Sequence, residues 1–358
     1  MSQPQDHSNA SKPVVVVTGG SGLIGTHVLD ELGQQYELVV LDQNPPQTMR
    51  DQVDFIETDF TDESSVKAAC ESVREQHGPR IASVIHLVAY YNFSGEPSPL
   101  YDQLTVEGTR KFLRQLKQAS LTVDQFVFSS SLLVMKPQEG EIDETSETCA
   151  EWAYPQSKLD AEDVIREERG ETPVVFLRIA GVYDEECHSL PLSQQITRIY
   201  EKQLESWVFP GDTSHGQTLV HLEDLARCIH RVIEKRNELG REEIFLVGEP
   251  EVLSYGELQD RIGELIHGKE WTTIRIPKVV AKAGAWVQGH LASDDDSPFI
   301  KPWMVDLADA NYNVNVDAAR TKLDWEPRHE LAETLPSMIE FLKRDPDSFY
   351  EKNNLGAS

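Results

Sequence analysis

Short apolar runs alternate with segments of helical length throughout the first half of the chain. The apolar runs are Val14–Val17, Glu37–Asp42 and residues 53–59, 81–89, 125–131 and 173–181. Strands that are apolar on both faces are typical of parallel sheets, because helices cover both sides of such sheets. We therefore expect an α/β fold with a doubly wound parallel sheet.

The pattern loosens after Gly181, where helical segments are separated by short extended pieces. This change predicts a first domain over residues 13–181 and a smaller, mixed domain over residues 182–358. We expect the second segment to return strands to the sheet near residues 218–222 and 243–248. The polar residues 1–12 are expected to form a disordered leader.

The composition disfavours several classes of partner. The 358 residues include 61 acidic and 33 basic side chains, which gives a net charge of −28. This charge argues against binding to nucleic acid or to an anionic membrane surface. The four cysteines are scattered without zinc-ligand spacing, and no apolar run approaches the roughly 18 residues of a membrane span. We expect a cytoplasmic protein that binds a small molecule and no metal.

The segment TGGSGLIG follows the first apolar run and precedes a helical stretch. Gly19, Gly22 and Gly25 can form a tight turn there and let backbone N–H groups approach a phosphate. Leu23 and Ile24 begin the expected helix, whose N-terminal dipole favours negative charge. This context indicates the dinucleotide-binding loop of a Rossmann-type fold.

Asp42 ends the second apolar run. A carboxylate at this position can accept hydrogen bonds from the adenosine ribose, and it would repel the 2′-phosphate of NADP. The next residues are Gln43, Asn44 and Pro45, so no arginine follows directly. The sequence therefore favours NAD over NADP.

The segment EWAYPQSKLDAE places Tyr154 and Lys158 four residues apart. On a helix, these two side chains share one face. An ammonium group there would lower the pKa of the phenol from about 10, which makes Tyr154 a candidate proton carrier. Pro155 fits the first turn of a helix, where no intrahelical donor is needed, so we expect the helix to start at or just before Tyr154.

A series of motifs in chain order resembles the extended short-chain dehydrogenase/reductases, the NAD-dependent epimerase/dehydratase family. They run from Val14 to about Lys343 and comprise TGGSGLIG, DFTD, HLVA, FSSSLLV, YPQSK, LRIAGVYD, VHLEDLA and ARTKLDWEPRHELAETL. The resemblance implies an oxidoreductase in which Tyr154 is the acid/base, while Lys158 lowers its pKa and binds the nicotinamide ribose. It also implies that Ser131 hydrogen-bonds the substrate oxygen.

The same resemblance assigns further residues to the cofactor. Asp59 and Phe60 would lie near the adenine, and the strand that ends at Ala89 would pass beneath the cofactor. The NAD-binding set implied in this way is Gly19, Gly22, Leu23, Ile24, Gly25, Asp42, Asp59, Phe60, Leu87, Ala89, Ser129, Tyr154, Lys158 and Ile179. Relatives often dimerise, so the resemblance also implies a homodimer.

Two departures from the family pattern narrow the expected reaction. Leu132 and Leu133 stand where 4,6-dehydratases carry an aspartate and a glutamate, so dehydration of a sugar is disfavoured. Gln217 stands where many nucleotide-sugar enzymes of the family place an arginine, which puts a nucleotide-sugar substrate in doubt. His215 could compensate, or it could be an ordinary polar loop residue.

Three aromatic or titratable residues are further candidates for substrate contacts. Tyr90 and Tyr91 directly follow Ala89 and could stack on a sugar or another ring, although loop packing explains them equally well. His188 could line a pocket from the second domain, but packing is the simpler explanation for it.

Three functions are compatible with these residues. A net dehydrogenase or reductase would exchange NAD in every turnover while converting a secondary alcohol or ketone, which could be sugar-like. A nucleotide-sugar epimerase would keep NAD bound and recycle it, and the missing arginine slightly favours the first interpretation. A non-catalytic NAD-sensing interaction protein is the third interpretation, against which the retained Tyr154 and Lys158 argue.

Overall fold

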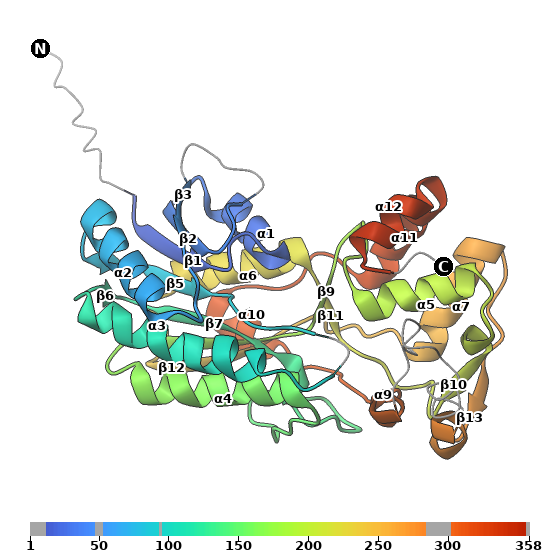
Figure 1. Ribbon diagram of the computed structural model, residues 1–358. Coiled ribbons are helices and arrows are strands. Elements are labelled where there is room, and N and C mark those ends of the chain that lie inside the picture. Colours follow the sequence, from blue (N-terminus) through green and yellow to red (C-terminus); the bar gives the residue numbers. More distant parts are fainter. Residues whose placement is uncertain (1–11, 47–52, 93–94, 284–301, 356–358) are drawn as a thin grey trace, which may run out of the picture.

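The computed structural model describes residues 12–46, 53–92, 95–283 and 302–355. At its centre is a parallel sheet of seven strands in the order β12-β8-β7-β5-β1-β2-β3 (Figure 1). The strands are β1 (Val14–Thr18), β2 (Glu37–Asp42), β3 (Val53–Glu57), β5 (Ser83–His86), β7 (Phe126–Ser131), β8 (Val174–Ile179) and β12 (Glu242–Val247). The expected doubly wound parallel sheet is confirmed. Apart from Lys12, the predicted leader lies outside the described residues.

Helices cover both faces of the sheet, and β1 shows why. Val15 and Val17 point into one apolar cluster, whereas Val14 and Val16 point into another, because successive strand residues face opposite sides. The first cluster includes side chains of α1 (Leu23–Leu32), α6 (Leu222–Glu234) and α10 (Asp317–Leu323). The second includes side chains of α2 (Glu63–His77), α3 (Glu107–Gln118) and α4 (Ala153–Glu168).

A smaller lobe lies at one end of the molecule (Figure 1). Its helices α5 (Leu190–Tyr200), α7 (Tyr255–His267), α11 (Leu331–Arg344) and α12 (Pro346–Lys352) share a third apolar cluster. The same lobe contains α9 (Pro302–Leu307) and a two-stranded ladder of β10 (Val208–Pro210) and β13 (Ile274–Ile276). A second ladder, β9 (Gly181–Tyr183) with β11 (Leu219–His221), lies between this lobe and the sheet.

Several predicted elements differ in detail from the structure. Residues 81–89 do not form one strand: β4 (Arg80–Ile81) pairs with β6 (Thr122–Val123), and the chain leaves the sheet after β5. The segment near residues 218–222 pairs with β9 rather than with the main sheet, whereas β12 joins the sheet beside β8. A three-residue strand carries too little alternation to specify its partner.

Short irregular helices complete the described part of the chain. A π-helix (Tyr101–Val106) leads directly into α3, and 3₁₀ turns span Leu132–Val134 and Leu204–Trp207. No helix in the four described ranges is both long enough and apolar enough to cross a membrane.

Glu249 follows β12 and is a buried carboxyl group that joins the end of this strand to the third apolar cluster. Its side chain accepts a hydrogen bond from the Tyr183 hydroxyl at 2.6 Å and from the Leu331 N–H at 2.9 Å. Burial raises the pKa of Glu249 to about 7, and the two hydrogen bonds only partly oppose this effect. The folded protein therefore holds a proton here more tightly than an exposed carboxyl does.

This raised pKa predicts a pH-dependent contribution to stability. The stabilisation that Glu249 provides is fully present below its ordinary pKa of 4.5, and it is lost as the pH rises through about 7. We expect wild type to lose about 1–3 kcal/mol of unfolding free energy relative to Glu249→Gln between pH 5 and pH 8. Urea denaturation of both proteins at the two pH values measures this difference. The titration of all other groups contributes equally to the two proteins and therefore cancels in the comparison. An equal difference at both pH values would contradict the assignment.

Candidate active site

The glycine-rich loop joins β1 to α1 and leaves the N-terminus of the helix open. Gly19 has a φ of +72°, a backbone conformation that residues other than glycine rarely adopt. Gly22 is the N-cap of α1, and the first turn contains neither a capping side chain nor an acidic residue. The first N–H groups of α1 are therefore available to an anion.

The space around the glycines fits a pyrophosphate. A Cβ at Gly25 would lie 2.4 Å from the Gly19 carbonyl oxygen, so the close packing of α1 on the loop requires glycine there. A Cβ at Gly22 would meet only that oxygen, at 3.4 Å. Gly22 also lines a large cavity, so the space beside it is open to a ligand. Glycine at such a position lets the backbone approach a pyrophosphate closely.

Asp42 lies at the C-terminal end of β2, beside the glycine-rich loop. Its Oδ2 accepts the Ser21 N–H at 3.0 Å, and its Oδ1 accepts the Asn44 N–H at 3.4 Å. The half-buried carboxylate is thus fixed against the loop while part of it stays accessible. This arrangement fits the predicted contact with the adenosine ribose.

Asp59 and Phe60 lie beyond β3. Asp59 Oδ1 accepts hydrogen bonds from the side chain and backbone N–H of Thr61, at 2.7 and 2.8 Å, and these bonds hold the pKa of Asp59 below its usual range. The Phe60 ring is 2% exposed and packs against His86 and Phe112. The ring belongs to the core, so Phe60 can offer a nearby adenine only its backbone.

Ser131, Tyr154 and Lys158 meet at the C-terminal end of β7. Helix α4 begins one residue before Tyr154, and Pro155 lies in its first turn, in agreement with the sequence prediction. The Ser131 side chain hydrogen-bonds the Tyr154 phenol. Lys158 Nζ donates to the Ser129 carbonyl oxygen at 2.6 Å and lies 5.8 Å from the centre of the Tyr154 ring. Strand β7 therefore holds both members of the helical pair.

Burial dominates the protonation of this group. It raises the pKa of Tyr154 to about 12, and the hydrogen bond with Ser131 lowers it by less. Burial also lowers the pKa of Lys158 to about 7, against the opposing effect of the Glu162 charge. The predicted lowering of the Tyr154 pKa is therefore wrong in this structure, because desolvation of the phenol outweighs an ammonium group 5.8 Å from its ring.

A cavity of about 1630 Å³ connects the glycine-rich loop with the smaller lobe. Single-ligand pockets usually measure roughly 300–1,000 Å³, so this cavity has room for a dinucleotide and a second molecule. The predicted residues that line it are Gly19, Gly22, Leu23, Ile24, Gly25, Leu87, Ala89, Tyr91, Ser129, Ser131, Tyr154, Lys158, Ile179 and His188. The cavity thus joins the loop, the proton-transfer group and the smaller lobe.

Five predicted residues do not line this cavity: Asp42, Asp59, Phe60, Tyr90 and His215. The Tyr90 ring packs against Tyr101, with 4.9 Å between ring centroids. His215 Nδ1 hydrogen-bonds the Asp309 carbonyl oxygen at 2.7 Å. This bond raises the pKa of His215 above its usual value, because it outweighs the opposing effect of burial. Both side chains are therefore held by contacts within the protein.

Two aromatic side chains flank Tyr154 in the cavity. The Tyr91 ring meets it edge-on at a centroid distance of 4.9 Å, and the Trp152 ring lies at 5.5 Å. Trp152 also lines the cavity but was not among the predicted site residues. The position of Trp152, two residues before Tyr154, could have indicated that it lies at the site. These rings restrict the directions from which a substrate can approach the phenol.

His188 reaches the cavity from the loop after β9. Its Nδ1 donates to Asp184 Oδ2 at 2.6 Å, and this hydrogen bond raises the pKa of His188 above its usual value. Cys187 and His188 both have positive φ values, +81° and +39°. Such conformations are costly for residues other than glycine, so the surrounding structure holds this loop in place.

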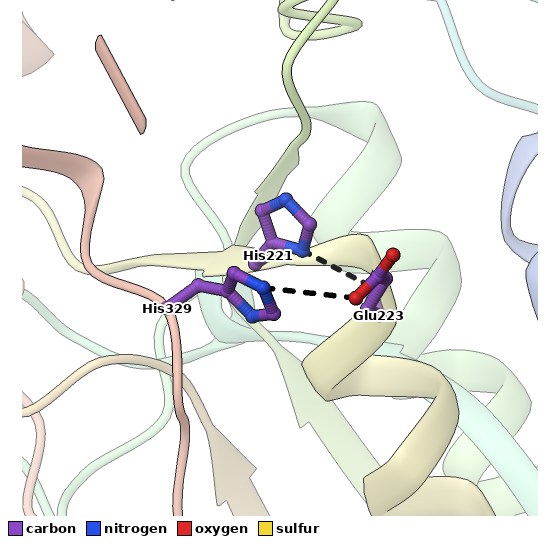
Figure 2. A group of neighbouring side chains, drawn as sticks. All are labelled: His221, Glu223 and His329. Carbon is purple, nitrogen blue, oxygen red and sulfur yellow. Dashed lines mark hydrogen bonds and ion pairs between the residues drawn. The ribbon is translucent and has the colours of Figure 1, made fainter. Parts of the chain in front are cut away.

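A second titratable cluster, away from the cavity wall, consists of His221, Glu223 and His329 (Figure 2). His221 Nδ1 accepts the Glu223 N–H at 3.2 Å and so caps α6, which leaves the proton of the neutral ring on Nε2. The two imidazole rings stack at 3.9 Å with 17° between their planes. Lone pairs of parallel stacked rings do not converge on one point, so this geometry suits a helix cap rather than a metal centre.

The fold and the site define a class of protein. A parallel Rossmann-type sheet carries an open glycine-rich loop, and a tyrosine–lysine pair on one helix meets a serine of β7 at the wall of a shared cavity. These are the parts of a nucleotide-dependent oxidoreductase.

Comparison with known families agrees with this class. The model of the NAD dependent epimerase/dehydratase family matches residues 15–248, and the chain belongs to this family. The resemblance inferred from the sequence motifs is therefore confirmed, and with it the expectation of NAD as the cofactor.

Two relatives illustrate the range of the family. The chain is 26% identical over 361 residues to the human protein named 3 beta-hydroxysteroid dehydrogenase type 7, covering 90% of this chain and 93% of the relative. It is also 26% identical over 275 residues to a putative UDP-glucose 4-epimerase of Methanocaldococcus jannaschii, covering 72% and 86%. A similar solved structure is that of UDP-glucuronic acid 4-epimerase from Bacillus cereus in complex with UDP-glucuronic acid and NAD. Its TM-score is 0.68 at 18% sequence identity, and the match covers 92% of this chain and 99% of the other.

Proposed function

We propose that the protein is an NAD-dependent oxidoreductase that interconverts a secondary alcohol and a ketone on a bulky, largely apolar substrate. One observation carries this proposal: Ser131, Tyr154 and Lys158 meet where the cavity passes from the glycine-rich loop toward the smaller lobe. A substrate held in that lobe has its reacting carbon next to the phenol, and the cofactor loop lies on the other side.

Tyr154 transfers the proton in this reaction. Its raised pKa keeps the phenol protonated at neutral pH, which suits donation to a ketone oxygen during reduction. Oxidation requires the phenolate, and protonated Lys158 favours that form through its charge. Ser131, already hydrogen-bonded to the phenol, orients the substrate oxygen. NAD supplies the hydride acceptor or donor when it is bound.

The chain offers a distinct group for each polar part of NAD. The open N-terminus of α1, with Gly22 as its cap, accommodates the pyrophosphate. Asp42 would accept hydrogen bonds from the hydroxyl groups of the adenosine ribose, and Lys158 would donate hydrogen bonds to the hydroxyl oxygens of the nicotinamide ribose. Apolar side chains such as Leu87 and Ile179 cover the remaining surface.

The substrate compartment favours an apolar molecule. Its wall in the smaller lobe includes Leu192, Trp207, Phe209, Leu258, Val280 and Val305. Among the described lining residues, the lysines and arginines are Lys158, Arg198 and Lys352, and Lys352 is paired with Glu186. A nucleotide diphosphate needs its charges paired when it leaves water, whereas an apolar ring system needs only contact area. The name of the human relative, a hydroxysteroid dehydrogenase, agrees with such a substrate.

A UDP-sugar epimerase is the second candidate, because several relatives carry that name and the proton-transfer group suits both reactions. Arg198 lines the cavity and is the residue that would face a diphosphate in this case. NAD would then remain bound and be recycled, since hydride returns to the same substrate.

Three measurements separate these functions: the nucleotide released on denaturation, the affinity for NADH and NADPH, and turnover of candidate substrates. Extensively dialysed protein is denatured and any released nucleotide is identified, and the native protein is titrated with NADH and NADPH. We expect little retained nucleotide and reversible NADH binding that is tighter than NADPH binding. We also expect oxidation of NADH when a ketosteroid is added, and no conversion of UDP-glucose. Near-stoichiometric NAD released only on denaturation, together with conversion of UDP-glucose, would favour the epimerase. Failure to bind either nucleotide would contradict both functions.

A further inference from the structure

Three consecutive serines at the end of β7 each contact a different residue of α4. The contacts are the Ser131 side chain with the Tyr154 phenol, the Ser129 carbonyl oxygen with Lys158 Nζ at 2.6 Å, and Ser130 Oγ with Glu162 Oε1 at 2.6 Å. The three α4 residues are spaced four apart, so they form one row along the helix. Two of them perform the proposed chemistry, and Glu162 is the third.

Glu162 is an ionised carboxylate in the protein interior. Its side chain is 0% exposed, and its oxygens accept hydrogen bonds from Arg178 Nε at 3.2 Å and from a terminal nitrogen of Arg178 at 2.9 Å. Arg166 adds a bond at 3.2 Å. Burial alone would raise the pKa of Glu162, but Arg178 and the Ser130 hydroxyl bring it below its usual value.

Stability does not readily explain this arrangement. A buried ion pair gains little net stability, since the cost of desolvating both ions offsets their attraction. An apolar pair could join α4 to β8 equally well at this place. An apolar pair lacks the carboxylate, which stands on α4 one helical turn from Lys158, whereas the two guanidinium groups come from β8 and from the following turn of α4.

The surroundings of Lys158 give that charge a role. The ammonium lies 4.9 Å from the centre of the Phe128 ring and close to the Tyr154 ring, neither of which carries a charge at neutral pH. The neighbouring His86 is neutral too, since burial and the Lys158 charge lower its pKa to about 3. Burial lowers the pKa of Lys158 to about 7, and the opposing effect comes from Glu162.

We propose that Glu162, anchored by Ser130 and Arg178, is a positioning residue that keeps Lys158 charged for the cofactor. The inference rests on the proposed function, because Glu162 acts through Lys158 and touches neither the cavity nor the reacting atoms. The competing explanation is an ion pair that only joins α4 to β8. A purely structural pair would change stability without changing the pH at which Lys158 loses its proton.

The test uses NADH affinity between pH 6 and pH 9, which requires no substrate. Wild type should lose affinity as Lys158 deprotonates. In Glu162→Gln, which removes the anion and leaves Arg178 unpaired, this loss should move to lower pH by about one unit. Glu162→Asp, which keeps the carboxylate, should restore most of the wild-type profile. Circular dichroism checks that each variant is folded.

Glu168→Gln is the matched control. Glu168 lies on the same helix and is also paired with arginines, at 3.4 Å to Arg110 and 2.6 Å to Arg114, but these pairs face α3. Its NADH profile should superimpose on that of wild type. A folded Glu162→Gln variant whose profile also superimposes on wild type would overturn the proposal and leave a structural ion pair.

Two further variants complete the test. If Glu162→Gln does not fold, Ser130→Ala weakens the anchor while keeping the charge, and a smaller shift in the same direction is expected; an unshifted profile overturns the proposal. Lys158→Met tests the proposed function separately, since it should abolish the pH dependence itself. If wild type and Lys158→Met give the same profile, the role of Lys158 in the proposed function fails, whatever Glu162 does.

Discussion

Tyr154→Phe is expected to lower kcat by roughly 10²–10⁴-fold while NADH binding stays within about twofold of wild type. The substitution removes only the phenolic hydroxyl and its hydrogen bond with Ser131. The ring keeps its contacts with Tyr91 at 4.9 Å and Trp152 at 5.5 Å, so the shape of the cavity is retained. Stopped-flow or steady-state turnover gives kcat, and fluorescence titration gives the affinity for NADH.

Tyr90→Phe is the matched control for this experiment. It removes the same atom from a tyrosine whose ring packs against Tyr101 and does not line the cavity. Its kcat should equal that of wild type. Turnover that survives Tyr154→Phe would mean that another group moves the proton, and loss of NADH binding would mean that the variant had disturbed the fold rather than the chemistry.

The parts of the site that the sequence predicts are those fixed by short-range geometry. Tyr154 and Lys158 lie on one helical face whatever surrounds them, and the glycine-rich loop is defined by the strand before it and the helix after it. Ser131 was assigned through the resemblance of FSSSLLV to the serine-bearing strand of the family, and it lies at the C-terminal end of β7. Tyr154, Lys158 and the loop could be found from the sequence because each depends on its own element.

The remaining contacts depend on chain segments that are far apart in the sequence. His188 and His215 are both loop histidines, but the first is turned to the cavity by a strained loop, and the second is tied to the Asp309 carbonyl, 94 residues away. The predicted lowering of the Tyr154 pKa was wrong for the same reason, because burial of the phenol outweighs the single charge that the helix places near it. The periodicity of the sequence contains no information on such long-range contacts or on burial of the phenol.

Substitutions of Gly25 and Gly22, at the start of α1, are expected to have opposite effects. The first should lower stability, and the second should lower the affinity for NADH, so the two variants separate packing of the loop from ligand binding. In Gly25→Ala, the new Cβ would lie 2.4 Å from the Gly19 carbonyl oxygen, with the backbone of Gly20 at 2.6 Å. Backbone atoms cannot move aside cheaply, so we expect a loss of about 2–3 kcal/mol in unfolding free energy. Urea denaturation measures this loss.

In Gly22→Ala, the new Cβ would meet only the Gly19 carbonyl oxygen, at 3.4 Å, and the φ of −77° suits alanine. The cost in stability should be about 1 kcal/mol or less, since alanine is only a poorer N-cap than glycine. The methyl group would nevertheless occupy the cavity wall where a pyrophosphate approaches the helix, so the Kd for NADH should rise at least tenfold. A stable Gly22→Ala protein that binds NADH as wild type does would contradict the placement of the pyrophosphate at the start of α1.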